Sequence, residues 1–479
     1  MDLGVFARQH RSAIRLLDAG WVQFDALVRD TGLPRRSVED LLAELADDVE
    51  RDGTALRLRP GTAQAWLDHV GRRANPPHDL AARIERHLAD VPPPLPALDH
   101  VQATLDTVVR RALWLDEHYD LGRLKLVFVG DHDLTSLAVR ELRADTDLAV
   151  VDVDDRVLEH IDRRSGGTIR TVHADLRFGL PRAVSGTADL VFSDPPYTPE
   201  GMALFASRAV ECLREPTHGR VLLAYGYSRR HPTLGHQTQK ALINLGLTFE
   251  AIVPGFHRYH GAQAVGSTAD LYVCHPTPRA RKKTKGGQAI YTHGPRSVEA
   301  VGTAPSEVRS KLDDLASAGG KKVVSAGPDW TKPTTAEEGT AVAVDLTGDP
   351  GPWLVRVLLG VNAERVAVLV PNAHPDLTDA PSQSALIELV APKYRLRLLR
   401  STPDSKHAVV VADRTETTTA AHRVWTRAHA RLGNVWPQAP ADLADLRLID
   451  LPRHRIVDVL RRLTAERPTD LEVEKAPRD

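Results

Sequence analysis

Helical spacing of hydrophobic residues dominates the first region of the chain, 1–70. Apolar side chains recur every three or four positions in three stretches that we predict to be helices: His10–Asp18, Phe24–Asp30 and Leu33–Leu45. The third stretch carries an apolar face made of Val38, Leu41, Leu42 and Leu45. Val49–Leu58 then alternates around Asp52-Gly53, a pair typical of a β-hairpin turn. Three helices followed by a hairpin predict a winged-helix domain.

Between 99 and 276 the pattern changes to short apolar runs separated by helical stretches. Runs such as Leu126–Val129 are apolar at every position, which is typical of parallel strands buried on both faces. Strands are predicted at Leu124–Val129, Leu148–Val153, Thr168–Val172, Ala188–Phe192, Arg220–Tyr225, Phe249–Val253 and Ala269–Val273. This alternation predicts a doubly wound, Rossmann-like α/β domain. A helix over His78–Leu88 and a stiff Pro-rich stretch, together 71–98, link it to the first region.

A second, smaller α/β module is predicted over 297–466. Its strands are Ala341–Leu346, Arg365–Val370, Tyr394–Leu399 and Ala408–Val411. Its segment Asp345–Gly351 weakly echoes the loop after the first strand of the larger domain. The module is either a degenerate copy of that domain or an α/β module without a site, and we favour the second because no later acid cluster accompanies the segment.

Two polar segments flank the predicted C-terminal module. The linker 277–296 carries the basic residues Arg279, Arg281, Lys282, Lys283 and Lys285. We interpret it as a solvated linker, because runs of like charge are usually hydrated. The closing stretch 467–479 is polar and is expected to be a flexible tail.

Composition excludes several classes of protein. The 479 residues include 62 Lys and Arg against 63 Asp and Glu, and the net charge of −1 excludes a polycationic nucleic-acid coat or a general attraction to anionic membranes. Cys212 and Cys274 are the two cysteines, too few for a disulfide framework, so a reducing, cytoplasmic location is expected. We expect no membrane-spanning segment, because no apolar run reaches about 18 residues.

Charge also bears on the predicted winged helix. Leu33–Glu50 holds Arg35 and Arg36 against six acidic residues, a balance of 2 − 6 = −4. Such a surface repels phosphates, so we predict no binding to duplex DNA. We expect its apolar face to pack instead on the larger domain or on a second copy of the chain, which would form a homodimer.

Acidic residues follow four successive predicted strands of the larger domain. They are Asp131 and Asp133 after Gly130, then Asp152 and Asp154, then Asp175, then Asp194 in Asp194-Pro195-Pro196-Tyr197. The carboxyl ends of such strands form the ligand site. The first loop lacks the GxGxxG pattern, so NAD and FAD fit poorly. Together the acids predict a strongly anionic pocket for a cationic ligand, an amine or a sulfonium.

The position of each acid suggests a role. Asp152 and Asp154 stand about 20 residues beyond the first turn, where a ribose hydroxyl is usually bound. Asp175, at the third strand end, is placed to accept from an adenine amine. Asp131 and Asp133 would hold a cationic arm. No pattern of metal ligands accompanies these residues, so no metal is expected.

The order of these motifs resembles class I methyltransferases and the related aminopropyltransferases. Asp194–Tyr197 is similar to the Asp-Pro-Pro-Tyr motif of amino-group methyltransferases. A longer match, through the loop from Gly130, Asp152–Arg156, Asp175–Arg177 and Asp194–Pro196, resembles the N4-bis(aminopropyl)spermidine synthase family, which also has a winged helix before its catalytic domain. This chain departs from the family at His132, where an Asp is usual, and at Tyr197, where archaeal members tend to have an acid.

The resemblance implies transfer of an aminopropyl group from decarboxylated S-adenosylmethionine to a polyamine amine. It implies catalytic roles for Asp194 and Tyr197, and donor binding by Gly130, Asp131, Asp152, Asp154, Asp175 and Pro195. Asp133, Pro196, Tyr225 and Tyr259 would bind the polyamine. Two alternatives stay open: an S-adenosylmethionine-dependent amino-group methyltransferase, and a winged-helix regulator that senses a small ligand.

Overall fold

The central sheet of the computed structural model has the order β6-β5-β4-β7-β8-β10-β9. Its strands are β4 (Lys125–Val129), β5 (Asp147–Asp152), β6 (Arg170–His173), β7 (Leu190–Ser193), β8 (Arg220–Tyr225), β9 (Leu247–Arg258) and β10 (Thr268–Pro276). The strands from β6 to β8 are parallel, and β10 runs antiparallel to both of its neighbours. The predicted Rossmann-like α/β fold is confirmed, and β9 is longer than expected. Strand order reverses between β4 and β7, the position where open α/β sheets bind ligands.

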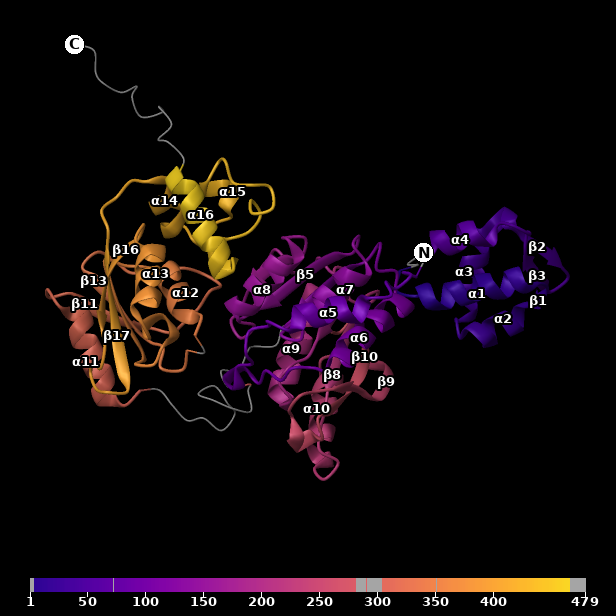
Figure 1. Cartoon of the computed structure of the whole chain (residues 1–479), viewed down its shortest axis with the longest axis horizontal. Coiled ribbons are helices and arrows are strands. Elements are labelled where there is room, and N and C mark those ends of the chain that lie inside the picture. The colour runs from indigo at the N-terminus through magenta and orange to yellow at the C-terminus, as the bar shows by residue number, and fades with distance from the viewer. Residues whose placement is uncertain (1–3, 72, 281–289, 291–303, 350, 466–479) are drawn as a thin grey trace, which may run out of the picture.

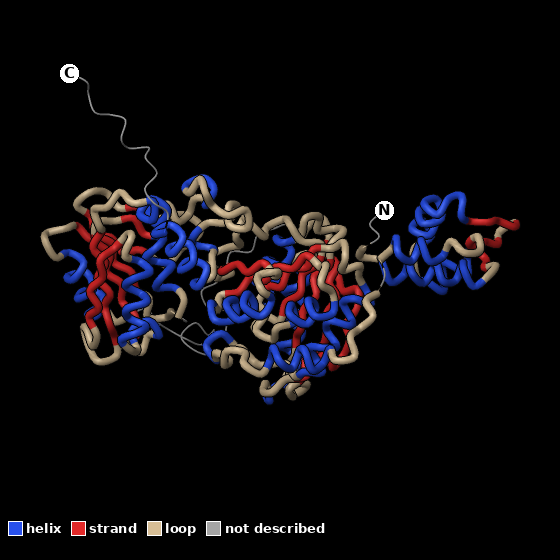
Figure 2. The backbone as a smooth tube through the Cα atoms, turned by 45° about the horizontal axis from the view of Figure 1, so that its top comes forward, coloured by secondary structure: helices blue, strands red, loops and turns tan. Residues whose placement is uncertain are grey.

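The strands of the central sheet lie among helices (Figure 2). Their side chains alternate between two apolar layers. Leu126 and Phe128 pack with one group of helices, α6 (Leu105–His118), α7 (Thr135–Leu142) and α8 (Asp155–Ser165). Val127 and Val129 face the other group, α9 (Pro199–Cys212) and α10 (Pro232–Asn244). Apolar residues on both sides of a strand therefore explain the unbroken runs seen in the sequence.

The N-terminal unit contains the predicted helices and hairpin. Its elements are α1 (Ala7–Ala19), β1 (Val22–Gln23), α2 (Phe24–Thr31), α3 (Arg35–Leu45), β2 (Val49–Asp52), β3 (Ala55–Leu58) and α4 (Ala63–His69), and α5 (Leu80–Leu88) follows. The expectation for the apolar face of α3 was wrong. Val38, Leu41, Leu42 and Leu45 are buried in the core of this unit, with Ile14 and Leu56 among their neighbours, and cannot pack elsewhere.

Helix α1, not α3, joins the N-terminal unit to the central domain. Arg11 is 3% exposed and donates to the carbonyl of Gly71 at 2.7 Å and to that of Glu117 on α6. The bond to Glu117 ties the unit to the start of the central sheet, since α6 leads directly into β4.

The C-terminal module, residues 304–465, has a sheet of order β11-β13-β15-β17-β16. Its main elements are α11 (Ser306–Ser317), β11 (Lys322–Ala326), β13 (Thr340–Asp345), α12 (Trp353–Gly360), β15 (Arg365–Pro371), α13 (Ala380–Val390), β16 (Tyr394–Leu399), β17 (His407–Arg414), α14 (Ala420–Thr426), α15 (Leu432–Val435) and α16 (Arg453–Ala465). The sequence did not indicate β11. The module also contains a separate, short parallel pair of strands, β12 (Thr334–Thr335) and β14 (Val361–Asn362).

The order and strand directions of this second sheet repeat β4-β7-β8-β10-β9 of the central one. Helix α12 occupies the place of α9 between strands, and α13 that of α10. The counterparts of β5 and β6 are missing from the described part of the module. Topology thus favours the first of the two expectations, a shortened copy of the central domain.

The three units lie in a row, with the N-terminal unit at one end, the central domain between, and the C-terminal module at the other (Figure 1). The C-terminal module packs on α8 and β6, and one apolar cluster runs from the central sheet into it. Short 3-10 helices complete the fold: Ala46–Asp48, Pro96–Leu98, Gln263–Val265, Pro375–Leu377 and Leu448–Asp450.

The structure describes residues 4–71, 73–280, 290, 304–349 and 351–465. Most of the predicted basic linker, with Arg281, Lys282, Lys283 and Lys285, and the whole tail 467–479 lie outside these residues. Within them, no helix combines the length and the apolar character needed to cross a membrane.

Candidate active site

A cavity of about 490 Å³ opens at the carboxyl ends of β4, β5, β6 and β7. Its wall includes most of the predicted site residues: Gly130, Asp131, Asp133, Asp152, Asp175, Asp194, Pro195, Pro196, Tyr197 and Tyr259. Two predicted residues do not line it. Asp154 caps the start of α8 and pairs with Arg156 at 2.7 Å, and Tyr225 packs behind Tyr197 with ring centroids 5.6 Å apart.

Backbone amides hold the acids of the first two strand ends. The Asp131 carboxylate accepts from the amides of Thr135 and Ser136 at 2.9 and 3.0 Å, at the start of α7. Asp152 accepts from the amides of Asp131 and Asp154 at 3.0 and 2.8 Å. Burial raises the pKa of Asp131 to about 8, so this carboxyl is largely protonated at neutral pH. Burial raises the pKa of Asp152 to about 6, so Asp152 stays largely ionised there.

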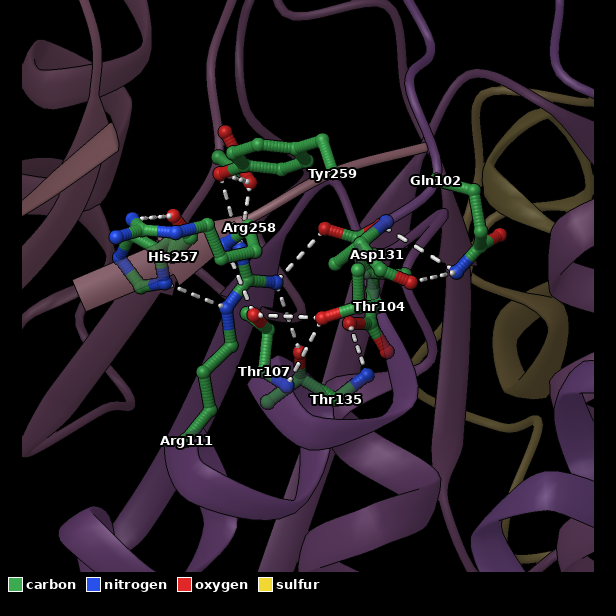
Figure 3. A network of polar contacts seen from close by, with 12 residues as sticks. Gln102, Thr104, Thr107, Arg111, Asp131, Thr135, His257, Arg258 and Tyr259 are labelled. Carbon is green, nitrogen blue, oxygen red and sulfur yellow. Dashed lines mark hydrogen bonds and ion pairs between the residues drawn. The ribbon is translucent and has the colours of Figure 1, made fainter. Parts of the chain in front are cut away.

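Arg111 on α6 is the central residue that sequence reasoning missed (Figure 3). Its side chain is 1% exposed and its guanidinium donates to Asp133 and to Asp194, each at 2.7 Å. Its Nε lies 3.1 Å from Nδ1 of His257, and a further bond reaches the Tyr259 hydroxyl. One signal was available: Arg111 sits in the apolar stripe of its helix, and a buried Arg must find acids.

Asp194 differs from the other acids because it is held by side chains rather than by backbone amides. Its Oδ2 accepts from Arg111 at 2.7 Å and from the Tyr259 hydroxyl at 2.6 Å, and its Oδ1 accepts from the Tyr197 hydroxyl at 3.1 Å. Burial raises the pKa of Asp194 to about 6, against the opposing charge of Arg111. The carboxyl is 20% exposed, so it can meet a molecule in the cavity and exchange a proton near neutral pH.

Asp175 has its acceptors occupied. Arg177 donates to it from its amide and its guanidinium, and the indole N–H of Trp353 donates to its Oδ2 at 2.9 Å. Burial would raise the pKa of Asp175, but these donors hold it below its ordinary value. The carboxylate therefore has no free lone pair for the adenine amine that the sequence predicted there.

The strongly anionic pocket expected from the sequence is not present. Arg111 neutralises Asp133 and Asp194 in part, Arg156 pairs with Asp154, and Arg177 pairs with Asp175. The count of acids was right, but the prediction left out the arginines that pair with them: Arg156 and Arg177 stand two residues after their acids, and Arg111 comes from α6. The cavity is closer to neutral than its acids suggest.

His132 forms part of the cavity wall between the first two strand ends. Its ring stacks on His100, with centroids 4.4 Å apart and planes inclined by 19°. Burial lowers the pKa of both imidazoles to about 4, so both are neutral. Both ring nitrogens of His132 lack a hydrogen-bond partner in the described part of the chain.

Among the described residues, no group of three or more His, Cys, Asp or Glu side chains is placed to hold a metal ion.

Comparison with known proteins shows which family this central region is similar to. Residues 79–287 match the model of the branched-chain polyamine synthase A C-terminal domain. An uncharacterized protein of Methanocaldococcus jannaschii is 35% identical over 175 residues, 36% of this chain and 44% of that protein. The N(4)-bis(aminopropyl)spermidine synthase of Thermococcus kodakarensis is 27% identical over 188 residues, 38% of this chain and 53% of the enzyme. The chain thus spans about half the length of the curated relatives it matches.

Among solved structures, the branched-chain polyamine synthase of Thermus thermophilus, in complex with N4-aminopropylspermidine and 5′-methylthioadenosine, aligns with a TM-score of 0.41 and 18% identity. It covers 59% of this chain and 91% of that enzyme. The resemblance read from the sequence is confirmed by the family match: residues 79–287 are similar to the C-terminal domain of the branched-chain polyamine synthases.

Proposed function

We propose that this chain transfers an aminopropyl group from decarboxylated S-adenosylmethionine to an amine of a polyamine. The observation that carries the proposal is the position of Asp194, a carboxyl with a pKa of about 6. It shares one cavity with Gly130, Asp131, Asp152 and Asp175, the strand-end residues that we call the donor half of the cavity. The similarity to enzymes named N(4)-bis(aminopropyl)spermidine synthase supports the same reaction.

The reaction needs a neutral amine in line with the carbon bound to sulfur. The nitrogen lone pair forms the new C–N bond while the C–S bond breaks, and the sulfur leaves with its electron pair as a neutral thioether. The new ammonium then loses its proton to the Asp194 carboxylate. Tyr197 and Tyr259, which donate to that carboxylate, would keep it oriented and offer ring faces to the cationic amine.

The other predicted residues divide between the two ligands. Asp152 would hold the ribose, close to Gly130 and Asp131 at the first turn. Pro195 and Pro196 would fix the backbone after Asp194 so that a carbonyl meets the amine. Asp133 accepts from Arg111 and from the amide of Ala103. The negative charge that Arg111 leaves uncompensated on Asp133 would attract the polyamine.

A methyltransferase using S-adenosylmethionine is the second candidate, and one observation favours it. Arg111 lies against Asp133 beside the first loop, and His132 there is neutral. This loop therefore repels the carboxylate of S-adenosylmethionine less than a loop with two unpaired acids would. The Asp194–Tyr197 sequence is also compatible with an amino-group methyltransferase.

Calorimetric titration with both sulfonium donors distinguishes the candidates. The aminopropyl proposal expects the decarboxylated donor to bind more tightly, because it has no carboxylate for an ionised acid of the cavity wall, such as Asp152, to repel. Equal or stronger binding of S-adenosylmethionine would replace this proposal with the methyltransferase. Mass spectrometry of a polyamine incubated with each donor then identifies the group transferred.

A further inference from the structure

We infer that the C-terminal module forms part of the donor site, through Trp353, a positioning residue for Asp175. This deepens the proposed function, because Asp175 lines the half of the cavity assigned to the donor. The indole N–H of Trp353 donates to Asp175 Oδ2 at 2.9 Å, and both side chains are 1% exposed. The bond therefore joins two units of the chain inside a dry interface, where a hydrogen bond to a charged acceptor is strongest.

The first turn of α12 is built to hold Trp353 in place. The Asp349 carboxylate accepts from the amides of Trp353 and Leu354 at 3.0 Å each, which caps the helix. His374 Nε2 lies 3.0 Å from the same carboxylate and fixes it from the next loop. The segment Asp345–Gly351, which weakly echoes the loop after the first strand of the central domain, thus has a structural role. It anchors the helix that reaches the donor site.

A second contact, one turn further along α12, attaches the helix to the same wall. Arg356 is fully buried, and its Nε lies 3.2 Å from Nδ1 of His173, the last residue of β6. Its terminal nitrogen donates to Asp155 at 2.9 Å, at the start of α8. Helix α12 therefore binds both elements that bracket the donor half of the cavity, the end of β6 and the start of α8.

Trp353 also covers the other partner of Asp175. The guanidinium carbon of Arg177 lies 4.8 Å from the Trp353 ring centroid, and Phe178 packs edge-on at 5.4 Å. Since Ala174, Asp175 and Leu176 line the cavity, the indole fixes the turn that shapes its wall. Loss of the N–H would free one carboxylate oxygen and loosen this turn.

Trp330 provides a matched control. It packs on Phe178 at 4.8 Å and on Trp353 at 5.9 Å, in the same aromatic cluster and from the same module. Its indole N–H is buried and makes no hydrogen bond within the described residues. Trp353→Phe and Trp330→Phe therefore remove the same atoms from one cluster, but only the first removes a bond to Asp175.

The test measures binding of 5′-methylthioadenosine to the full chain by calorimetry. We expect Trp353→Phe to weaken binding about tenfold, Trp330→Phe to stay within about twofold of wild type, and Trp353→His, which keeps a ring N–H, to recover part of the loss. Equal affinity in Trp353→Phe and wild type would overturn the inference. Thermal unfolding of both Phe variants checks that the packing loss is shared.

Hydrogen exchange in the ligand-free protein tests the same bond without a nucleoside. Amides 174–178 should exchange at least about fivefold faster in Trp353→Phe than in Trp330→Phe, because local opening then lacks one constraint. Unchanged exchange would also refute the inference. If wild type binds no nucleoside while the exchange difference appears, the donor-site proposal fails and the positioning role of Trp353 stands.

Discussion

Replacing Arg111 by Met should change the ionisation of the active site more than its shape. The side chain of Met fills much of the same buried space but supplies no charge. In the wild-type protein one guanidinium lies 2.7 Å from both Asp133 and Asp194. Without it, two neighbouring carboxyls share a buried site and cannot both ionise near neutral pH. The variant therefore tests whether Arg111 is the residue that keeps Asp194 available as a proton acceptor.

The size of the effect follows from the geometry. A cation at this distance lowers a carboxyl pKa by about 1–3 units, and each unit corresponds to about 1.4 kcal/mol. Burial with Arg111 present sets the pKa of Asp194 at about 6, so removal should move it to between about 7 and 9. At pH 7 the ionised fraction then falls about twofold to ninetyfold.

The assay is kcat/KM against pH from 5.5 to about 9.5, on wild type, Arg111→Met and Arg111→Lys. In wild type, activity should fall as pH drops through the Asp194 pKa, because the protonated carboxyl cannot accept a proton. In Arg111→Met this acid limb should lie about 1–3 units higher, with much of the rate recovered at high pH. Arg111→Lys keeps the positive charge but cannot donate to both carboxylates with one planar group, so the acid limb should shift less than in Arg111→Met. The amine substrate ionises equally in all three assays.

An acid limb in Arg111→Met that coincides with wild type would refute this reasoning. A direct measurement separates the charge effect from any loss of turnover. The carbon-13 shift of the Asp194 carboxyl, followed during a pH titration, reports its pKa without any substrate. If that pKa does not rise, Arg111 has only a packing role.

Two further predictions concern other parts of the chain. Asp194→Asn should lower turnover by about 10²–10⁴ with the nucleoside affinity and thermal unfolding nearly unchanged, and retention of more than about a tenth of wild-type activity would make Asp194 structural and Asp152 the next candidate. The N-terminal unit should give no gel shift with duplex DNA at about 150 mM salt below micromolar protein, because basic residues of this unit are paired with acids, Arg35 with Glu39 at 2.8 Å and Arg57 with Glu50 at 2.6 Å. Saturation at lower concentration would contradict this prediction and favour the regulator.

The strands of the central domain could be predicted because they are buried on both faces. Runs such as Leu126–Val129 contain no polar residue, so they stand out clearly from the helices around them. Strand β8 begins and ends at the predicted residues. Strand β11 was missed for the opposite reason. It is an edge strand whose residues are largely exposed, with Lys322 at its start and Val324 45% exposed, so its pattern lacks the apolar run.

The candidate site was predicted as a set of positions, and its charge was not. Strand ends of one parallel sheet meet at one edge whatever the side chains are, so topology alone brought Asp131, Asp152, Asp175 and Asp194 together. The neutralising cations follow no such rule. Two of them are local, since Arg156 and Arg177 stand two residues after Asp154 and Asp175. Arg111, however, comes from a helix before the sheet, and the indole N–H of Trp353, an uncharged donor, comes from another unit 178 residues beyond Asp175. Long-range partners of this kind leave no spacing in the sequence.

Comparison of the two sheets indicates which acids can take part in chemistry. Asp345, at the end of β13, stands where Ser193-Asp194 ends β7, and it accepts from the amides of Ala304 and Thr347. An acid bound by backbone amides is fixed, because those amides cannot turn away when a ligand arrives. Asp194 is bound by the side chains of Arg111, Tyr197 and Tyr259, and hydroxyls can rotate to admit a fourth donor. Under the proposed function, the edge of the central sheet would therefore exchange a proton with a bound amine, whereas the same edge of the C-terminal module would hold α12 against the donor half of the cavity.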